Sequence, residues 1–184
     1  MAGWQEQLDE LLRERRPALI GYATMLTGDR VSAEDLVHDA LVRTYGRPRG
    51  LPTIDAAHAY VRRAVATMYL DRLRSRRRFT AALPRLASPE TRAEDDADGR
   101  LDVRAALGEL PPRERACVLL RFYDDLTVPD IADVLGLRPG SVKRYLSDGI
   151  GRLGALLGTA AALDDPAAGD AVLGHVHIVE RSGR

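Results

Sequence analysis

Residues 126–157 constrain the fold of this chain most, because they carry the pattern of two short helices joined by a tight turn. Thr127, with Asp130 three residues later, resembles a capping box and predicts a helix start. Gly136 can take the left-handed conformation that ends a helix, and Pro139 can occupy the first position of a second helix. The stretch therefore predicts a helix-turn-helix.

The second of these helices has two different faces. Apolar residues recur at helical spacing on the inner face: Val142, Leu146, Ile150 and Leu153. The outer face begins with small or cationic residues that can approach phosphates and base edges: Gly140, Ser141, Lys143, Arg144 and Ser147. A helical hairpin with a glycine turn is also a common packing unit, so this pattern alone does not decide between DNA binding and packing.

Composition and charge limit the other possibilities. Hydrophobic residues make up 45% of the 184 residues and aromatic residues only 5%, which favours helices packed through aliphatic side chains. Lysine and arginine number 27 and aspartate and glutamate also 27, a net charge of zero. A free-standing DNA-binding protein gains non-specific affinity from a basic excess. We therefore expect a larger partner to supply much of the affinity for DNA.

The pattern of charge and apolar residues predicts an all-α chain of two small helical domains. We expect a first domain at 1–80, a flexible acidic linker at 81–100, a second domain at 101–158 and a flexible tail at 159–184. In the tail, residues 175–178 alternate in polarity like a short strand. A metal site at His175 and His177 is not expected, nor is any cofactor.

Single features exclude some classes of protein. Cys117 is the only cysteine, which excludes an internal disulfide or a multi-cysteine zinc site, and its apolar neighbours predict a buried core residue. No apolar run reaches the roughly 18 residues of a membrane span, so a cytoplasmic protein is expected. The sequence contains neither a nucleophile with a partnered base nor a phosphate-binding glycine loop, so an enzyme is not expected.

In the first domain, apolar stripes lie on either side of Pro17, which starts or kinks a helix. The next helix is predicted from Ser32, as its cap, to Tyr45. Its inner face carries Leu36, Val37, Ala40, Leu41 and Thr44, and its outer face carries Glu34, Asp35, His38 and Asp39. The outer face is either an ordinary solvated surface or a docking face for a basic partner.

A long helix is predicted from about Asp55 to Arg78, and five of its last seven residues are arginine. That many guanidinium groups exceed what the helix dipole requires, and nucleic-acid phosphate is the partner we expect for them. In the second domain, a helix beginning at Pro112 should direct its arginines outward: Arg113, Arg115 and Arg121.

Two stretches carry a family resemblance. LGELPPRERACVLLRFYDDLTVPDIADVLGLRPGSVKRYLSDGIGRL resembles the fourth conserved region of bacterial extracytoplasmic-function sigma factors. LTGDRVSAEDLVHDALVRTYG and AYVRRAVATMYLDRLRSRRR resemble their second conserved region. The matches cover about residues 8 to 157 in the family's order. The resemblance implies an alternative sigma factor, a subunit that binds core RNA polymerase and directs promoter-specific transcription initiation.

The resemblance also implies roles for individual residues. The polymerase-docking residues would be Asp35, His38 and Asp39. Residues at the minus-ten box would be Tyr60, Arg62, Arg63, Thr67, Arg74, Arg76 and Arg77, and Tyr69 is a further candidate for contacting unstacked bases. Residues at the minus-thirty-five box would be Arg138, Pro139, Ser141, Lys143, Arg144 and Ser147. An anti-sigma factor would be a further partner.

Three positions depart from the family's usual residues. Thr67 stands near a frequent asparagine, Arg138 replaces a Ser or Thr helix cap, and Asp148 stands where a basic residue is frequent. We expect changed downstream-box preference at Thr67 and weaker or shifted upstream-box binding at Asp148. Two alternatives remain open from the residues alone: a stand-alone helix-turn-helix regulator and a helical protein-binding adaptor.

Overall fold

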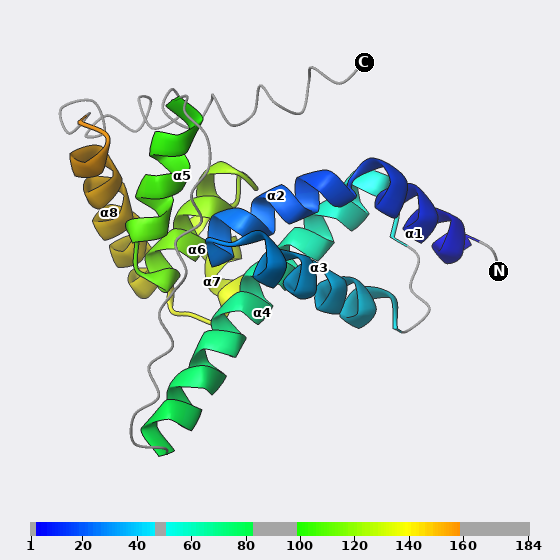
Figure 1. Ribbon diagram of the computed structural model, residues 1–184, viewed down its shortest axis with the longest axis horizontal. Coiled ribbons are helices and arrows are strands. Elements are labelled where there is room, and N and C mark those ends of the chain that lie inside the picture. The colour runs from blue at the N-terminus through cyan, green and yellow to red at the C-terminus, as the bar shows by residue number, and fades with distance from the viewer. Residues whose placement is uncertain (1–2, 47–50, 83–98, 159–184) are drawn as a thin grey trace. The chain divides into compact units, whose positions relative to one another are not determined.

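The computed structural model describes residues 3–46, 51–82 and 99–158, and every regular element in these ranges is an α-helix (Figure 1). The chain divides into two compact units, Met1–Glu94 and Asp95–Arg184. Unit 1 contains α1 (Gly3–Glu14), α2 (Arg16–Thr27), α3 (Arg30–Tyr45) and α4 (Ile54–Ala82). Unit 2 contains α5 (Gly99–Glu109), α6 (Pro112–Phe122), α7 (Val128–Leu135) and α8 (Pro139–Leu156). The predicted all-α fold with a helix-turn-helix in the second unit is confirmed.

Parts of the predicted organisation fall outside these ranges. Helix α4 continues to Ala82 and α5 begins at Gly99, so both enter the predicted linker by two residues. Residues 83–98 of that linker lie outside the described residues. The same is true of the predicted tail at 159–184, with its strand and its two histidines.

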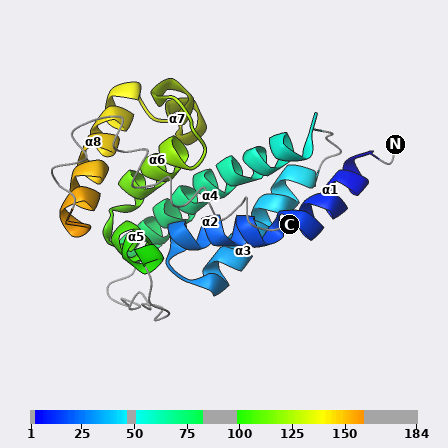
Figure 2. The same ribbon diagram turned by 90° about the horizontal axis from the view of Figure 1, so that it is seen from above.

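In unit 1, helices α2, α3 and α4 pack against one another, and α1 packs against α2 and α4 (Figure 2). Their fully buried side chains form one apolar core: Leu11, Leu19, Tyr22, Leu26, Leu36, Val37, Val61 and Val65. Pro17 lies in the first turn of α2, so it starts a helix and does not kink one. The inward face predicted for α3 is confirmed, because all five of its members are buried.

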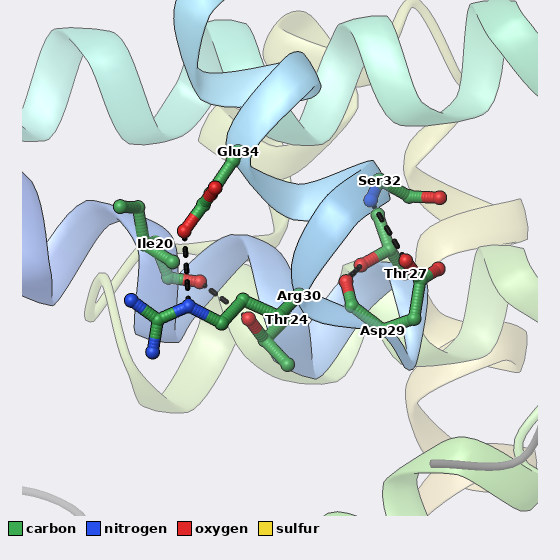
Figure 3. Close-up of polar contacts among 7 residues, drawn as sticks. All are labelled: Ile20, Thr24, Thr27, Asp29, Arg30, Ser32 and Glu34. Atoms are coloured by element: carbon green, nitrogen blue, oxygen red, sulfur yellow. Dashed lines mark hydrogen bonds and ion pairs between the residues drawn. The ribbon is translucent and has the colours of Figure 1, made fainter.

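The turn between α2 and α3 corrects one prediction (Figure 3). Gly28 ends α2 with a φ of 86°, a left-handed conformation that glycine adopts without strain. Asp29 caps α3, since its carboxylate accepts a hydrogen bond of 2.7 Å from the backbone N–H of Ser32. The prediction of Ser32 as the cap is therefore wrong, and α3 begins two residues earlier, at Arg30. An ionised carboxylate is a strong acceptor for the free N–H groups of a helix start.

In unit 2, α6 and α7 pack against α8 and against each other, and α5 packs against α8. The largest fully buried side chains are Leu107, Leu110, Leu120, Ile131, Val118 and Val142. Cys117 is also fully buried, and burial raises the pKa of its thiol to about 12, which confirms its prediction as a core residue. None of the described helices is both long and apolar enough to span a lipid bilayer.

Arg115 was expected to point outward, and this prediction is wrong. Its side chain is 8% exposed, and its guanidinium donates hydrogen bonds to the backbone carbonyl oxygens of Gly108 and Leu110. These carbonyls lie at the end of α5, where no further helical turn supplies donors. Arg115 thus joins α6 to the end of α5 and serves the fold of unit 2.

Candidate nucleic-acid interface and docking face

The turn that positions α8 is fixed by three local features. The Thr127 hydroxyl accepts from the Asp130 N–H at 3.4 Å, while the Asp130 carboxylate accepts from the Thr127 N–H at 3.2 Å, which completes the predicted capping box. Gly136 takes a φ of 61° and ends α7, and the N–H of Leu137 returns to the carbonyl of Ala132 at 2.9 Å. The direction in which α8 leaves the turn is therefore set by local hydrogen bonds.

Helix α8 begins at Pro139, as predicted. Arg138 precedes it in an extended conformation with no side-chain capping bond, and its carbonyl oxygen accepts from the N–H groups of Ser141 and Val142. Proline needs no donor partner at this position and its fixed φ suits a first helical residue. Arg138 at the cap position is thus compatible with a well-formed helix.

The first turns of α8 expose the residues expected to read DNA. The exposed side chains are Arg138, Pro139, Lys143, Arg144 and Ser147, and Ser141 is half-buried. The opposite face of the helix is buried by Val142 and Leu146. Asp148 is also exposed on α8, so its carboxylate places a negative charge close to these cations.

A cluster around Tyr145 was not predicted from the sequence. Arg113 of α6 donates a hydrogen bond of 3.0 Å to the Tyr145 hydroxyl, and this bond is the main cause that lowers the pKa of Tyr145. The guanidinium carbon of Arg144 lies 5.3 Å from the centroid of the same ring. Arg113 is 32 residues from Tyr145, so only the packing of α6 on α8 brings them together.

The predicted docking residues lie on the outer surface of α3, and all three are exposed. Their surroundings differ. Asp39 forms an ion pair with Arg72 of α4, and the same guanidinium contacts the carbonyl oxygen of Asp35 at 3.4 Å. In the part of unit 1 that the structure describes, the carboxylate of Asp35 and the ring of His38 have no ionic partner. Asp35 and His38 are therefore available to a partner, whereas Asp39 is already paired.

Two valines extend the same face of α3. Val31 is 73% exposed and Val42 is 57% exposed. With Asp35 and His38 between them, the four residues follow spacings of four, three and four, which place them on one side of a helix. This spacing is visible in the sequence, although the two valines were not among the residues predicted for docking.

The residues expected at the minus-ten box do not all lie on one surface of α4. Tyr60 is 38% exposed, Arg62 and Arg63 are half-buried, and the Thr67 hydroxyl donates to the carbonyl of Arg63 at 2.9 Å. Tyr69 is only 8% exposed, so its proposed role in contacting unstacked bases is wrong. It shares the buried side of α4 with Leu70 of the core of unit 1.

Arg62 contacts a buried histidine. Its guanidinium lies 3.1 Å from Nδ1 of His58, which is 4% exposed. Burial, followed by the charges of Arg62 and Arg15, lowers the pKa of His58 to about 4, although Asp55 acts in the opposite direction. Because a guanidinium can only donate, the neutral ring accepts at Nδ1. His58 therefore restrains the side chain of Arg62.

The arginine-rich end of α4 is largely exposed. Arg74 forms an ion pair of 3.2 Å with Asp71 in the preceding turn, and Arg76 and Arg77 are exposed. Arg72 differs from the others because it faces α3. Within the described residues, no three or more His, Cys, Asp or Glu side chains are arranged to hold a metal ion.

Both units match known protein families. Residues 11–79 match the family described as Sigma-70 region 2, and residues 100–153 match Sigma-70, region 4. The RNA polymerase sigma-E factor of Streptomyces antibioticus is 32% identical over 150 residues, which cover 80% of this chain and 82% of that protein. The ECF RNA polymerase sigma factor SigL of Mycobacterium tuberculosis is 30% identical over 142 residues, covering 74% and 80%.

A solved structure agrees with the fold. The sigma factor RpoE from Bartonella quintana, crystallised with the anti-sigma factor NepR, matches with a TM-score of 0.58 and 22% identity, covering 85% of this chain and 98% of that one. Regions 2 and 4 in this order define a sigma factor of the sigma-70 type. The chain belongs to the extracytoplasmic-function RNA polymerase sigma factors of that family, and it is an alternative sigma factor that directs transcription initiation.

Proposed function

We propose that three surfaces of this sigma factor have separate roles in transcription initiation. The outer face of α3 docks on core RNA polymerase, α4 contacts the minus-ten box, and the first turns of α8 read the minus-thirty-five box. One observation carries this assignment: α3 and α8 each bury one apolar face and, apart from half-buried Ser141, leave exposed the side chains that the family resemblance assigns to partners. Those exposed residues contribute little to the core.

For the docking face, the exposed charges support a basic partner surface. Asp35 is exposed and forms no ion pair with any residue that the structure describes, and His38 lies one turn further along α3. The exposed valines at either end of this face, Val31 and Val42, would add apolar contact area. A partner patch of basic residues flanked by apolar ones fits this face, and we assign that partner as core polymerase.

For the upstream box, the geometry of α8 supports major-groove binding. Lys143, Arg144 and Ser147 lie on its exposed side, and Arg138 lies just before its first turn. An α-helix fits the major groove of DNA, where cationic side chains can bond to guanine and to phosphates. Asp148 is expected to weaken this contact. Holding both units on polymerase would compensate, because it raises the effective concentration of each DNA-binding surface.

The wider role follows from the same assignment. The sigma factor would perform no chemistry itself, because polymerase supplies the catalytic step, and it would act in the cytoplasm where core polymerase transcribes. An anti-sigma factor is a further candidate partner, since the structurally similar RpoE was crystallised with one. The domain limits proposed are region 2 at 1–80 and region 4 at 101–158.

The first test is binding to purified core polymerase. Asp35→Arg should weaken binding at least tenfold, because a cation would face the basic partner surface. Asp9→Arg is the matched control, since it makes the same charge change at an exposed position of α1 and should bind like the wild type. Equal weakening by both variants would show that net charge, not the α3 face, governs binding.

Asp39 needs a different variant, because reversing it alone would place two cations side by side at Arg72. The charge swap Asp39→Arg/Arg72→Asp keeps the internal pair. If the swap still loses polymerase binding while it folds normally, Asp39 itself contacts polymerase. If the charge-swap variant binds polymerase like the wild type, the role of Asp39 is to join α3 to α4 through its ion pair with Arg72.

Transcription from a library of promoters then tests the DNA surfaces. Wild-type holoenzyme should select two boxes at a fixed spacing, and Lys143→Ala should change selection only at the upstream box. A chain that ignores polymerase but shifts DNA by itself would instead be a stand-alone regulator. A chain that binds neither would be an adaptor, and the proposal would fail.

A further inference from the structure

An aspartate on the exposed side of α8 has an arginine one turn to either side of it. Asp148 follows Arg144 by four residues and precedes Arg152 by four, and all three residues are exposed. This spacing allows opposite charges to form ion pairs along a helix. Within the residues that the structure describes, however, Asp148 pairs with neither arginine. Both guanidinium groups make other contacts instead.

The contacts that hold the two arginines both involve α6. Arg152 donates a hydrogen bond of 3.1 Å from Nε to the carboxylate of Glu114, which is buried on α6. The guanidinium carbon of Arg144 lies 5.3 Å from the ring centroid of Tyr145. Arg113 of α6 donates a hydrogen bond of 3.0 Å to the hydroxyl of that ring. Helix α6 therefore holds Arg152 directly and Arg144 through the ring of Tyr145.

The contact with the ring matters because Asp148 and a DNA base compete for Arg144. An arginine binds guanine through a pair of N–H groups, and a carboxylate binds a pair of the same kind. A guanidinium that lies over an aromatic ring keeps most of its N–H groups free for a base. The competing ion pair is also weak, because an acid that follows a base along a helix is the less favourable order. A contact with one ring can therefore decide which state Arg144 adopts.

We propose that Tyr145 is a positioning residue of the upstream-box surface, whose ring, anchored by Arg113, holds Arg144 away from Asp148 and in place to read a base. This inference rests on the proposed function, since it requires Arg144 to read the minus-thirty-five box. It also explains how α8 carries an exposed acid one turn from an arginine that reads DNA. Without the ring, Arg144 pairs with Asp148, and selection of its base falls.

The test uses holoenzyme rebuilt from the full chain and the promoter library. Arg144→Ala first identifies the position of the upstream box at which base selection is lost. The measurement is the enrichment of the preferred base at that position. Tyr145→Leu removes the ring, Tyr145→Phe keeps the ring without its hydroxyl, and Asp148→Ala removes the competing carboxylate. The double variant Tyr145→Leu/Asp148→Ala completes a cycle that isolates the competition between ring and carboxylate.

Tyr145→Leu should lower the enrichment about two- to fivefold, the effect expected from loss of one exposed contact between a cation and a ring. In the Asp148→Ala background the same change should lower it by at most about 1.5-fold, because no carboxylate competes for Arg144. Tyr145→Phe should stay within about twofold of wild type, since the ring remains. Equal losses in both backgrounds would overturn the proposal in favour of a packing role for Tyr145. Equal losses in Tyr145→Phe and Tyr145→Leu would overturn it in favour of the hydroxyl.

Failure of the proposed function gives a different result. If Arg144→Ala leaves base selection unchanged at every position, Arg144 does not read the upstream box, and the inference fails with that assignment. If Arg144→Ala abolishes selection at one position while Tyr145→Leu keeps it, only the positioning role fails. Tyr145 is half-buried, so Tyr145→Leu can lower the stability of unit 2. Removal of exposed Asp148 cannot replace packing lost with the ring, so a loss of stability alone would not be rescued in the double variant.

Discussion

Acidification should destabilise unit 1 through His58. The imidazole is 4% exposed, and its pKa is lowered from 6.5 to about 4, mainly by burial and then by Arg62 and Arg15, against the opposite effect of Asp55. Folded protein keeps this ring neutral, while an unfolded chain binds a proton below about pH 6.5. The stability contributed by neutral His58 is therefore complete above pH 6.5 and falls as the pH drops towards 4.

The size of this effect follows from the two pKa values. Between pH 7.5 and pH 5, the unfolded state gains nearly a full proton at His58 that the folded state does not bind. A shift of this size lowers the free energy of unfolding by about 2 kcal/mol over that interval. Below about pH 4 the folded state also binds the proton, so His58 causes no further loss there.

Trp4 provides the assay. It is the only tryptophan of the chain and lies in α1, which packs against α2 and α4. Urea unfolding of the full chain, followed by tryptophan fluorescence at pH 7.5 and pH 5, thus reports on unit 1. His58→Gln removes the titration and keeps an oxygen that can accept from Arg62, so the difference between the two proteins isolates His58. Identical pH dependence in wild type and His58→Gln would refute the reasoning.

Four further predictions concern unit 2. Gly149→Ala should lower the free energy of unfolding by about 1–2 kcal/mol, because the added Cβ would lie 3.0 Å from Cγ2 of buried Val118. Gly151→Ala should instead raise the free energy of unfolding by up to about 1 kcal/mol, because nothing lies within 4 Å of its added Cβ. Thermal melts in which the Gly149→Ala protein is more stable than the Gly151→Ala protein would contradict both predictions. Thr127→Ala should cost about 1 kcal/mol in the same melts, with an unchanged melt as the contrary result, because α7 loses its capping box. Cys117, whose pKa is raised to about 12, should react with a thiol reagent at pH 8 only in urea; rapid reaction of native protein would show that the core opens.

Features that depend on neighbouring residues could be predicted from the sequence. The start of α7, the glycine that ends it and the proline that begins α8 all lie where the helix-turn-helix pattern indicated. Capping bonds and backbone conformations of this kind act over three or four residues, so the sequence carries them directly. The inner faces of α3 and α8 were predictable for the same reason, because helical periodicity is a local property.

The choice between two neighbouring residues that could each cap the same helix was harder to predict. Asp29 and Ser32 can each cap a helix, and the sequence alone favoured Ser32, whereas the structure uses Asp29. Arg115 was expected to point outward and Tyr69 to contact unstacked bases, but both are buried. Long side chains can be buried when their polar ends reach a partner, as Arg115 reaches the end of α5. Whether such a partner lies within reach depends on how the helices pack, which the sequence pattern of one helix does not show.

Arg72 and Asp39 show how this affects the candidate site. Periodicity placed Asp39 correctly on the outer face of α3 and Arg72 at the arginine-rich end of α4, but the two residues are 33 positions apart. Their ion pair is partly exposed and is worth at most about 1 kcal/mol to the fold. It nevertheless occupies one of the two carboxylates among the predicted docking residues, which leaves Asp35 as the one without an ion pair to any described residue. Helical patterns can therefore predict which charges reach the surface, whereas the packing of α3 on α4 decides which of them a partner can bind.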